Sequence, residues 1–138
     1  MAMIVAGEYS LDDFMEAMLT GKGRRAYFSD GKSFKRTSQR MQLFLRDGFS
    51  CVDCGLDGNC FALESALAKD SPHLNLYHVS TNADGKSVRI LFTKDHILPR
   101  YRGGKDIMSN YQVMCQICNA RKGHQLENER VRATRIVD

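Results

Sequence analysis

The sequence has no apolar run long enough to cross a membrane, since such a span needs about 18 apolar residues in succession. Its N-terminal stretch MAMIVAGEYSLDDF lacks both a basic region and a long apolar segment, so it does not resemble a secretion signal. Internal repeats and low-complexity tracts are also lacking, apart from two cysteine pairs. We therefore expect a soluble, cytoplasmic protein with no membrane partner.

Basic residues are lacking at the N-terminus, where residues 1–20 hold four acidic residues and no Lys or Arg. Residues 21–46 then hold eight Lys or Arg against Asp30 alone. Such a block attracts a polyanion, and nucleic acid is the obvious candidate. A solvated face that keeps the protein soluble is the alternative interpretation.

The 138 residues, of which 43% are apolar, suffice for one core but not for two. We expect a helical and basic appendage over residues 1–32 and one main domain over residues 33–138. Cap residues and apolar spacing predict helices in YSLDDFMEAMLTGKG and in SFKRTSQRMQLFLRDG, the second with Arg36 and Arg40 facing outward. CFALESALAKD is interpreted as a third helix, and RKGHQLENERVRATRIV as a terminal one.

Two strands are predicted around the turn signal TNADGK, which contains an Asp-Gly step. HLNLYHVS and SVRILFTKDHI would form this hairpin, and YQVM would be a short extended segment. LPRYRGGKDIMSN, rich in Gly, Pro and Asn, would be a loop between them. The fold class predicted from these elements is α+β.

Four of the five cysteines form two Cys-x-x-Cys pairs about 60 residues apart, whereas Cys60 is interpreted as a small buried apolar side chain. Four thiolates are the ligands that a tetrahedral structural zinc prefers, and disulfides are not expected inside a cell. We therefore predict a zinc site that joins the chain before the hairpin to the chain after it. Its ligands would be Cys51, Cys54, Cys115 and Cys118.

KDHILPRYRGG is the stretch that suggests catalysis. Asp95 offers a hard oxygen ligand for a divalent cation, and His96 offers an imidazole that can accept a proton at neutral pH. The pair suits metal-assisted attack of water on a phosphodiester. Taken alone, an Asp-His pair is weak evidence, since it is more often incidental.

From Cys51 to Lys122 the chain resembles an HNH endonuclease of the four-cysteine type. The residues that carry this resemblance are the stretches RDGFSCVDCG and DHILPRYRGGKDIMSNYQVMCQICNARKG. The resemblance implies a ββα-metal core stapled by a structural zinc, with the N-terminal helices as additions. It also implies hydrolysis of DNA phosphodiester bonds, in a phage-infected host or a bacterial cell.

The same resemblance implies the role of each site residue. His96 would be the general base, and Asn110 would hold the loop and orient that base. Asp95 and Asn119 would bind a catalytic cation, with magnesium or manganese favoured because both ligands offer oxygen. Asn119 stands where the family often has a His, and His124 is a lesser alternative ligand. The candidate DNA-binding residues are Arg36, Arg40, Arg100, Arg102, Arg121 and Lys122.

The substrate would be double-stranded DNA, which a monomer would nick and a homodimer could cut on both strands. A zinc-stapled DNA-binding module without catalysis is one alternative, and it would not need His96. The other is a junction-resolving nuclease of the endonuclease VII type. That group relies on an extended helical dimerisation region, which is hard to place in the tail after Lys122.

Overall fold

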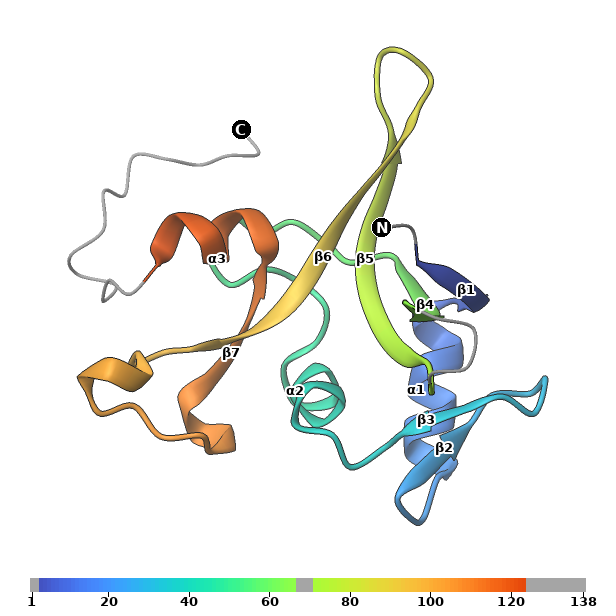
Figure 1. The fold of residues 1–138 in the computed structure, drawn as a ribbon. Coiled ribbons are helices and arrows are strands. Elements are labelled where there is room, and N and C mark those ends of the chain that lie inside the picture. Colours follow the sequence, from blue (N-terminus) through green and yellow to red (C-terminus); the bar gives the residue numbers. More distant parts are fainter. Residues whose placement is uncertain (1–2, 67–70, 124–138) are drawn as a thin grey trace.

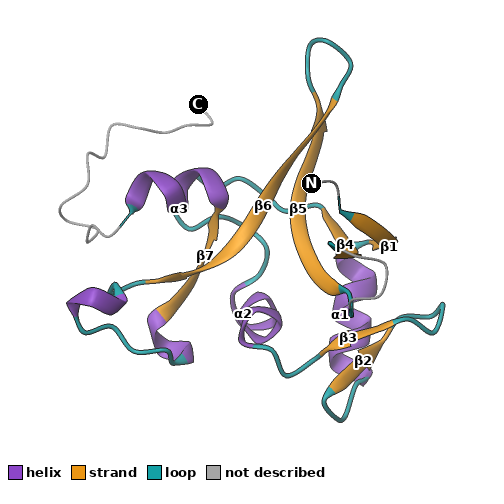
Figure 2. Ribbon diagram, in the orientation of Figure 1, coloured by secondary structure: helices purple, strands orange, loops and turns teal. Residues whose placement is uncertain are grey.

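The computed structural model describes residues 3–66 and 71–123, and it has a mixed α/β architecture (Figures 1 and 2). This architecture confirms the predicted class in outline. The helices of the described part are α1 (Leu11–Thr20), α2 (Gln39–Asp47) and α3 (Gln116–Lys122), with short 3-10 turns η1 (Arg100–Arg102) and η2 (Met108–Asn110). The strands are β1 (Ile4–Tyr9), β2 (Arg25–Tyr27), β3 (Ser33–Lys35), β4 (Cys60–Ser65), β5 (His73–Thr81), β6 (Ser87–His96) and β7 (Tyr111–Cys115).

Five of the strands form one antiparallel sheet in the order β1-β4-β5-β6-β7, and β2 and β3 form a separate hairpin. The predicted hairpin is confirmed as β5 and β6, and its tip stands away from the rest of the described chain (Figure 1). The predicted extended segment is β7. β6 therefore runs down into the body of the molecule, where it ends at Asp95 and His96.

Local sequence signals set the helix ends. Ser10 caps α1 and exchanges side-chain and backbone hydrogen bonds with Asp13, which is a capping box. Ser38 caps α2, and Gly48 is its C-cap with a positive φ of 90°, which glycine adopts without strain. Both helices are confirmed, although the segment before Ser38 forms β3 instead of helix.

The prediction of a helix in CFALESALAKD is wrong for its described part, because residues 60–65 form strand β4. β4 lies between β1 and β5 in the sheet, and its consecutive residues 61–65 are all buried, so both of its faces are covered. A short apolar run of this kind cannot be told from a helix by periodicity alone. Glu64, fully buried in β4, accepts hydrogen bonds from Asn75 and Tyr77 and pairs with Arg89.

One hydrophobic core contains residues from both sides of the domain boundary that we predicted at residue 32. Phe14 of α1 stacks on Phe61 of β4 with ring centroids 4.3 Å apart, and Phe44 of α2 meets the same ring edge-on. β1 also pairs with β4 in the main sheet. The functional division at residue 32 stays a prediction, but physically the N-terminal segment is packed into the core.

None of the helices in residues 3–66 and 71–123 is long and apolar enough to cross a membrane. The predicted terminal helix overlaps α3 only at Arg121 and Lys122, because α3 begins at Gln116 and has Gly123 as its C-cap. The rest of the predicted helix after Gly123, together with His124, lies outside the described residues.

Candidate active site

The four predicted zinc ligands converge on one point of the structure. Their sulfur atoms all lie within 4.8 Å of one another, and the sulfurs of Cys54 and Cys115 are 3.9 Å apart. Tetrahedral zinc with Zn–S bonds of about 2.3 Å places its sulfurs about 3.8 Å apart. The cluster therefore has the spacing of a tetrathiolate site. Val52, in the first Cys-x-x-Cys turn, donates to the carbonyl of Val113 and so ties that turn to β7.

The chemistry of these thiols also fits a cation. Burial raises the pKa of Cys115 to about 11, and burial together with the neighbouring sulfurs raises the pKa of Cys118. Burial acts in the same direction on Cys51, but backbone N–H groups around its sulfur outweigh that effect and lower its pKa. The four sulfurs could all be thiolates this close together only with a positive ion among them, and such an ion would deprotonate them. Cys60 lies apart from this cluster, half-buried in β4.

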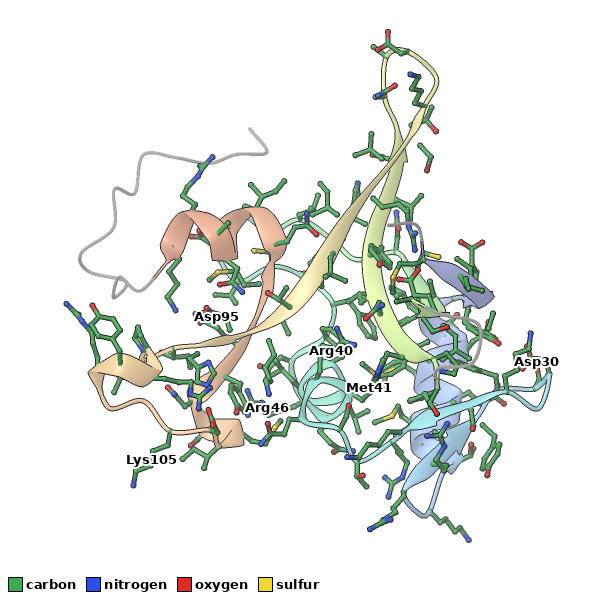
Figure 3. All side chains as sticks on the ribbon, in the orientation of Figure 1. Asp30, Arg40, Met41, Arg46, Asp95 and Lys105 are labelled. Carbon is green, nitrogen blue, oxygen red and sulfur yellow. The ribbon has the colours of Figure 1, made fainter. Side chains whose placement is uncertain are left out.

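Asp95 is buried at the end of β6, and its side chain points toward α3 (Figure 3). Its Oδ2 atom lies 2.5 Å from the Nζ of Lys122 and accepts a 2.9 Å hydrogen bond from Gln112. The Lys122 ammonium also donates to the carbonyl of His96 at 2.6 Å. Lys122 is 3% exposed, so it is an internal partner of Asp95. This corrects the expectation that Lys122 presents its charge to bound phosphate.

Asn119 is oriented by a short chain of hydrogen bonds. Thr93 on β6 uses its hydroxyl proton to donate to the carbonyl of Met114 at 2.7 Å. The same oxygen can then only accept, and it accepts from the Nδ2 of Asn119 at 2.8 Å. The amide nitrogen of Asn119 therefore faces Thr93, which leaves Oδ1 as the atom available to a cation.

His96 has a carboxylate partner that the sequence did not reveal. Its Nε2 lies 2.7 Å from Oδ1 of Asp106, and its ring meets Tyr111 edge-on at 5.0 Å. The hydrogen bond from His96 holds the pKa of Asp106 below its usual range, so Asp106 is ionised at neutral pH. A carboxylate on Nε2 favours the tautomer with the proton on that atom and leaves Nδ1 as the basic nitrogen.

The loop between β6 and β7 is closed by Asn110. Its Oδ1 accepts from the backbone N–H of Leu98 at 2.9 Å, and its Nδ2 donates to the carbonyls of Leu98 and Lys105 at 3.0 Å each. Gly104 makes this closure possible, because a Cβ there would lie 1.7 Å from the carbonyl oxygen of Leu98. Arg46 of α2 donates to the carbonyls of Met108 and Tyr111 and fastens the far end of the loop.

An open cleft of about 450 Å³ brings Asp95, His96 and Asn119 together, although Asn119 lies on α3 and the other two end β6. Lys94, Arg100 and Tyr101 also line this active-site cleft. The arrangement therefore gathers a basic imidazole and two side-chain oxygens around one accessible space.

Some of the other predicted DNA-binding residues are exposed, whereas others are held by hydrogen bonds within the protein. Arg102 and Arg121 are exposed, and Arg100 is exposed with its Nε 3.6 Å from Asp106. Arg36 precedes α2 and donates to the carbonyl of Gly23. Arg40 does not face outward as predicted, since its guanidinium donates to the carbonyl of Leu74 and to Asn75 (Figure 3).

Asp106, Gln112 and Thr93 are the site residues that sequence reasoning missed. Gln112 lies opposite Asp95 in the register between β6 and β7, so a correct register could have identified it. Asp106 carries no comparable signal, because its approach to His96 depends on how the loop closes. Thr93 lies two residues before Asp95 in β6 and was not distinguished from other strand residues.

Comparison with known proteins agrees with this site. Residues 84–134 match the family model described as HNH endonuclease. The chain therefore carries an HNH endonuclease segment, and the resemblance predicted from its motifs is confirmed there. Cys51 and Cys54 lie before the matched residues, so their part in a zinc site rests on the sulfur cluster instead. No curated protein and no solved structure matches the chain.

Proposed function

We propose that the protein is a metal-dependent HNH endonuclease that hydrolyses phosphodiester bonds of double-stranded DNA. The observation that carries this proposal is the meeting of Asp95, His96 and Asn119 in one open cleft, within the segment that matches the family. β6 and α3 supply lining residues of the cleft, and β7 pairs with β6 and leads into α3, an arrangement that supports a ββα-metal core.

His96 is the general base in this mechanism. Asp106 holds the proton on Nε2, so Nδ1 is free to take a proton from the attacking water. The Asp106 carboxylate also stabilises the imidazolium that forms. Asn110 is a positioning residue, because it fixes the loop that carries Asp106.

Asp95 and Asn119 offer the oxygen ligands that magnesium or manganese prefers. Both hydrogen bonds to Asp95 fall on Oδ2, and the Asn119 nitrogen is turned toward Thr93, so one oxygen of each side chain remains for a cation. When bound, the cation supplies Lewis-acid stabilisation of the developing charge on phosphate. Lys122 pairs with the buried Asp95 carboxylate through Oδ2 and so orients it.

The structural zinc has a separate role in this proposal. Cys115 caps α3 and Cys118 lies within it, so Asn119 directly follows a zinc ligand. The other two ligands lie in the Cys51–Cys54 turn, which is tied to β7. Binding zinc would therefore fix the position of Asn119 relative to the end of β6. By family resemblance the products carry 5′-phosphate and 3′-hydroxyl ends.

Relaxation of supercoiled plasmid tests the proposal. The wild-type chain, at full zinc content, is expected to nick the plasmid with magnesium or manganese and not after the divalent cation is withdrawn. His96→Ala should abolish nicking, whereas His78→Ala should not, because His78 lies on β5 and bonds the carbonyl of Asp57. Equal nicking by His96→Ala and the wild type would refute the proposed base.

The alternative of a DNA-binding module without catalysis predicts a different result. It requires the zinc site and basic residues but not His96, and would give DNA binding without nicking under any cation. The pairing of His96 with an ionised carboxylate favours the nuclease, since a binding module has no need of an oriented base. For a junction-resolving nuclease, selective cleavage of a four-way junction over linear duplex would be the expected outcome.

A further inference from the structure

Two further clefts lead from the active-site cleft to the β2–β3 hairpin. The larger, here the central groove, has a volume of about 610 Å³ and lies between β3, the start of α2 and the start of β5. The smaller, here the hairpin cleft, is lined by Arg24, Arg25, Lys35 and Thr37. Arg25 and Lys35 line both of these clefts, and Lys94 lines both the central groove and the active-site cleft. The three clefts are therefore adjoining.

The described residues along the central groove and the hairpin cleft include no Asp or Glu. The central groove has Arg25, Lys35, Arg40 and Lys94 on its walls. By contrast, the cleft over α1 is lined by Asp13 and Glu16, with no Lys or Arg among its described residues. The central groove and the hairpin cleft are thus basic, whereas the cleft over α1 is acidic, and a basic groove of this kind is the electrostatic pattern of a nucleic-acid-binding surface.

Two cations of the groove, Arg25 and Lys94, donate hydrogen bonds to neutral partners. The Arg25 guanidinium donates to the hydroxyl of Ser33 at 2.8 and 3.2 Å. The Lys94 ammonium donates to Gln39 at 2.8 Å and lies 4.3 Å from the centre of the Tyr111 ring. These contacts orient both charges without neutralising them. Each side chain therefore remains available to bind an anion. Because it is already oriented, it loses less conformational entropy on binding than an unrestrained side chain would.

Helix α2 adds to the positive electrostatic potential of the central groove. Its first turn contains no acidic residue, and its cap Ser38 and first residue Gln39 line the central groove. The positive end of the helix dipole is therefore directed at the groove. Arg40 fastens this end of α2 to β5 through Leu74 and Asn75, so the groove walls are joined to each other.

We propose that the central groove and the hairpin cleft bind the DNA backbone next to the phosphate that is cleaved, and so extend the binding surface beyond the active site. This inference rests on the proposed function for its ligand. It assigns backbone binding to Arg25, Lys35 and Lys94. Arg40, one of the residues predicted from the sequence, instead joins the groove walls.

Binding of a fluorescein-labelled DNA duplex, followed by anisotropy over a series of salt concentrations, tests this proposal. His96→Ala is the background, so that the duplex is not cut. The test variant adds Arg25→Gln and Lys35→Gln, and the control adds Lys32→Gln and Lys86→Gln, which are exposed and line none of the three clefts. Both variants lose two positive charges. Thermal unfolding of each confirms that it is folded.

The test variant should bind about tenfold more weakly, and its log–log salt dependence should fall by about two. The control should bind like the background. Equal weakening in both variants, or none in the test variant, would overturn the proposal even if the wild type nicks plasmid. If only the test variant binds DNA more weakly and the wild type never nicks plasmid, the groove still binds DNA but the proposed nuclease activity is refuted.

Discussion

The Nε2 atom of His96 lies 2.7 Å from the Oδ1 atom of Asp106, across a loop that Asn110 holds closed. The two residues are ten positions apart and belong to different segments, the end of β6 and the loop after η1. Their contact gives the candidate base a fixed orientation and tautomer. It is the feature of this site that most favours an active enzyme over a binding module.

Replacing Asp106 by Asn should slow nicking without preventing DNA binding. The amide keeps the size of the side chain but removes the charge that stabilises the imidazolium. We expect a fall of about 10- to 100-fold in the cleavage rate, as for other residues that orient a reacting group. Rates and duplex affinity of Asp106→Asn and wild type, measured with the same cation, check this. An unchanged rate would show that Asp106 does not orient His96.

The same pair makes a pH-dependent contribution to stability. Because the pKa of Asp106 is lowered in the folded state, its contribution is present above the unfolded value of about 3.9 and is lost as pH falls through the lowered value. The melting midpoint of wild type should exceed that of Asp106→Asn at neutral pH. The difference should shrink on acidification through that range. A difference that persists at lower pH would contradict this assignment.

Lys122→Met should destabilise the fold, because it leaves the buried carboxylate of Asp95 without its ammonium partner. Removing one member of a buried ion pair costs about 3 kcal/mol or more. Magnesium or manganese should raise the melting midpoint of this variant more than that of wild type, since the cation restores a positive charge at Asp95. Lys105→Met, at an exposed position, is the control and should unfold like wild type.

Loss of any zinc ligand should disrupt both folding and activity. Cys118→Ser should lower the bound zinc, measured by metal analysis of the purified chain, and should broaden or abolish the thermal transition. Cys60→Ser is the matched control, because Cys60 lies outside the sulfur cluster. It should retain one zinc per chain. Normal zinc content in Cys118→Ser would refute the four-cysteine site.

Asn119→His tests the proposed ligand set for the catalytic cation. An imidazole in place of an amide oxygen should favour softer cations, so the ratio of nicking with nickel to nicking with magnesium should rise. Asn119→Ala should lose activity with both, by about 100-fold or more if a ligand is lost. The nicking activity of Thr93→Val should lie between those of wild type and Asn119→Ala, because this variant frees the Asn119 amide to rotate. Wild-type activity in Asn119→Ala would exclude Asn119 as a ligand.

The amino-acid sequence by itself determined the features that depend on local chemistry. Cysteine spacing identified the four sulfurs that meet, and Asp-Gly in TNADGK identified the β5–β6 turn. Ser caps and terminal glycines identified α1 and α2. The motif around Asp95 and His96 indicated the resemblance to HNH endonucleases, which the match over residues 84–134 confirms for that segment. Each of these signals is carried by short motifs and reflects backbone conformation or ligand chemistry, even where two motifs lie far apart, as the cysteine pairs do.

Tertiary structure alone decided the features that depend on contacts distant in sequence. CFALES became a strand because β1 and β5 pair with it on both sides, against its helical pattern. Lys122 turned inward because α3 packs on β6 beside a buried carboxylate. Loop closure brought Asp106 to His96, and a neutral partner oriented each of Arg25 and Lys94 along the groove. Such contacts exist only once the chain has folded, since they join residues whose spacing in sequence carries no information about their separation in space.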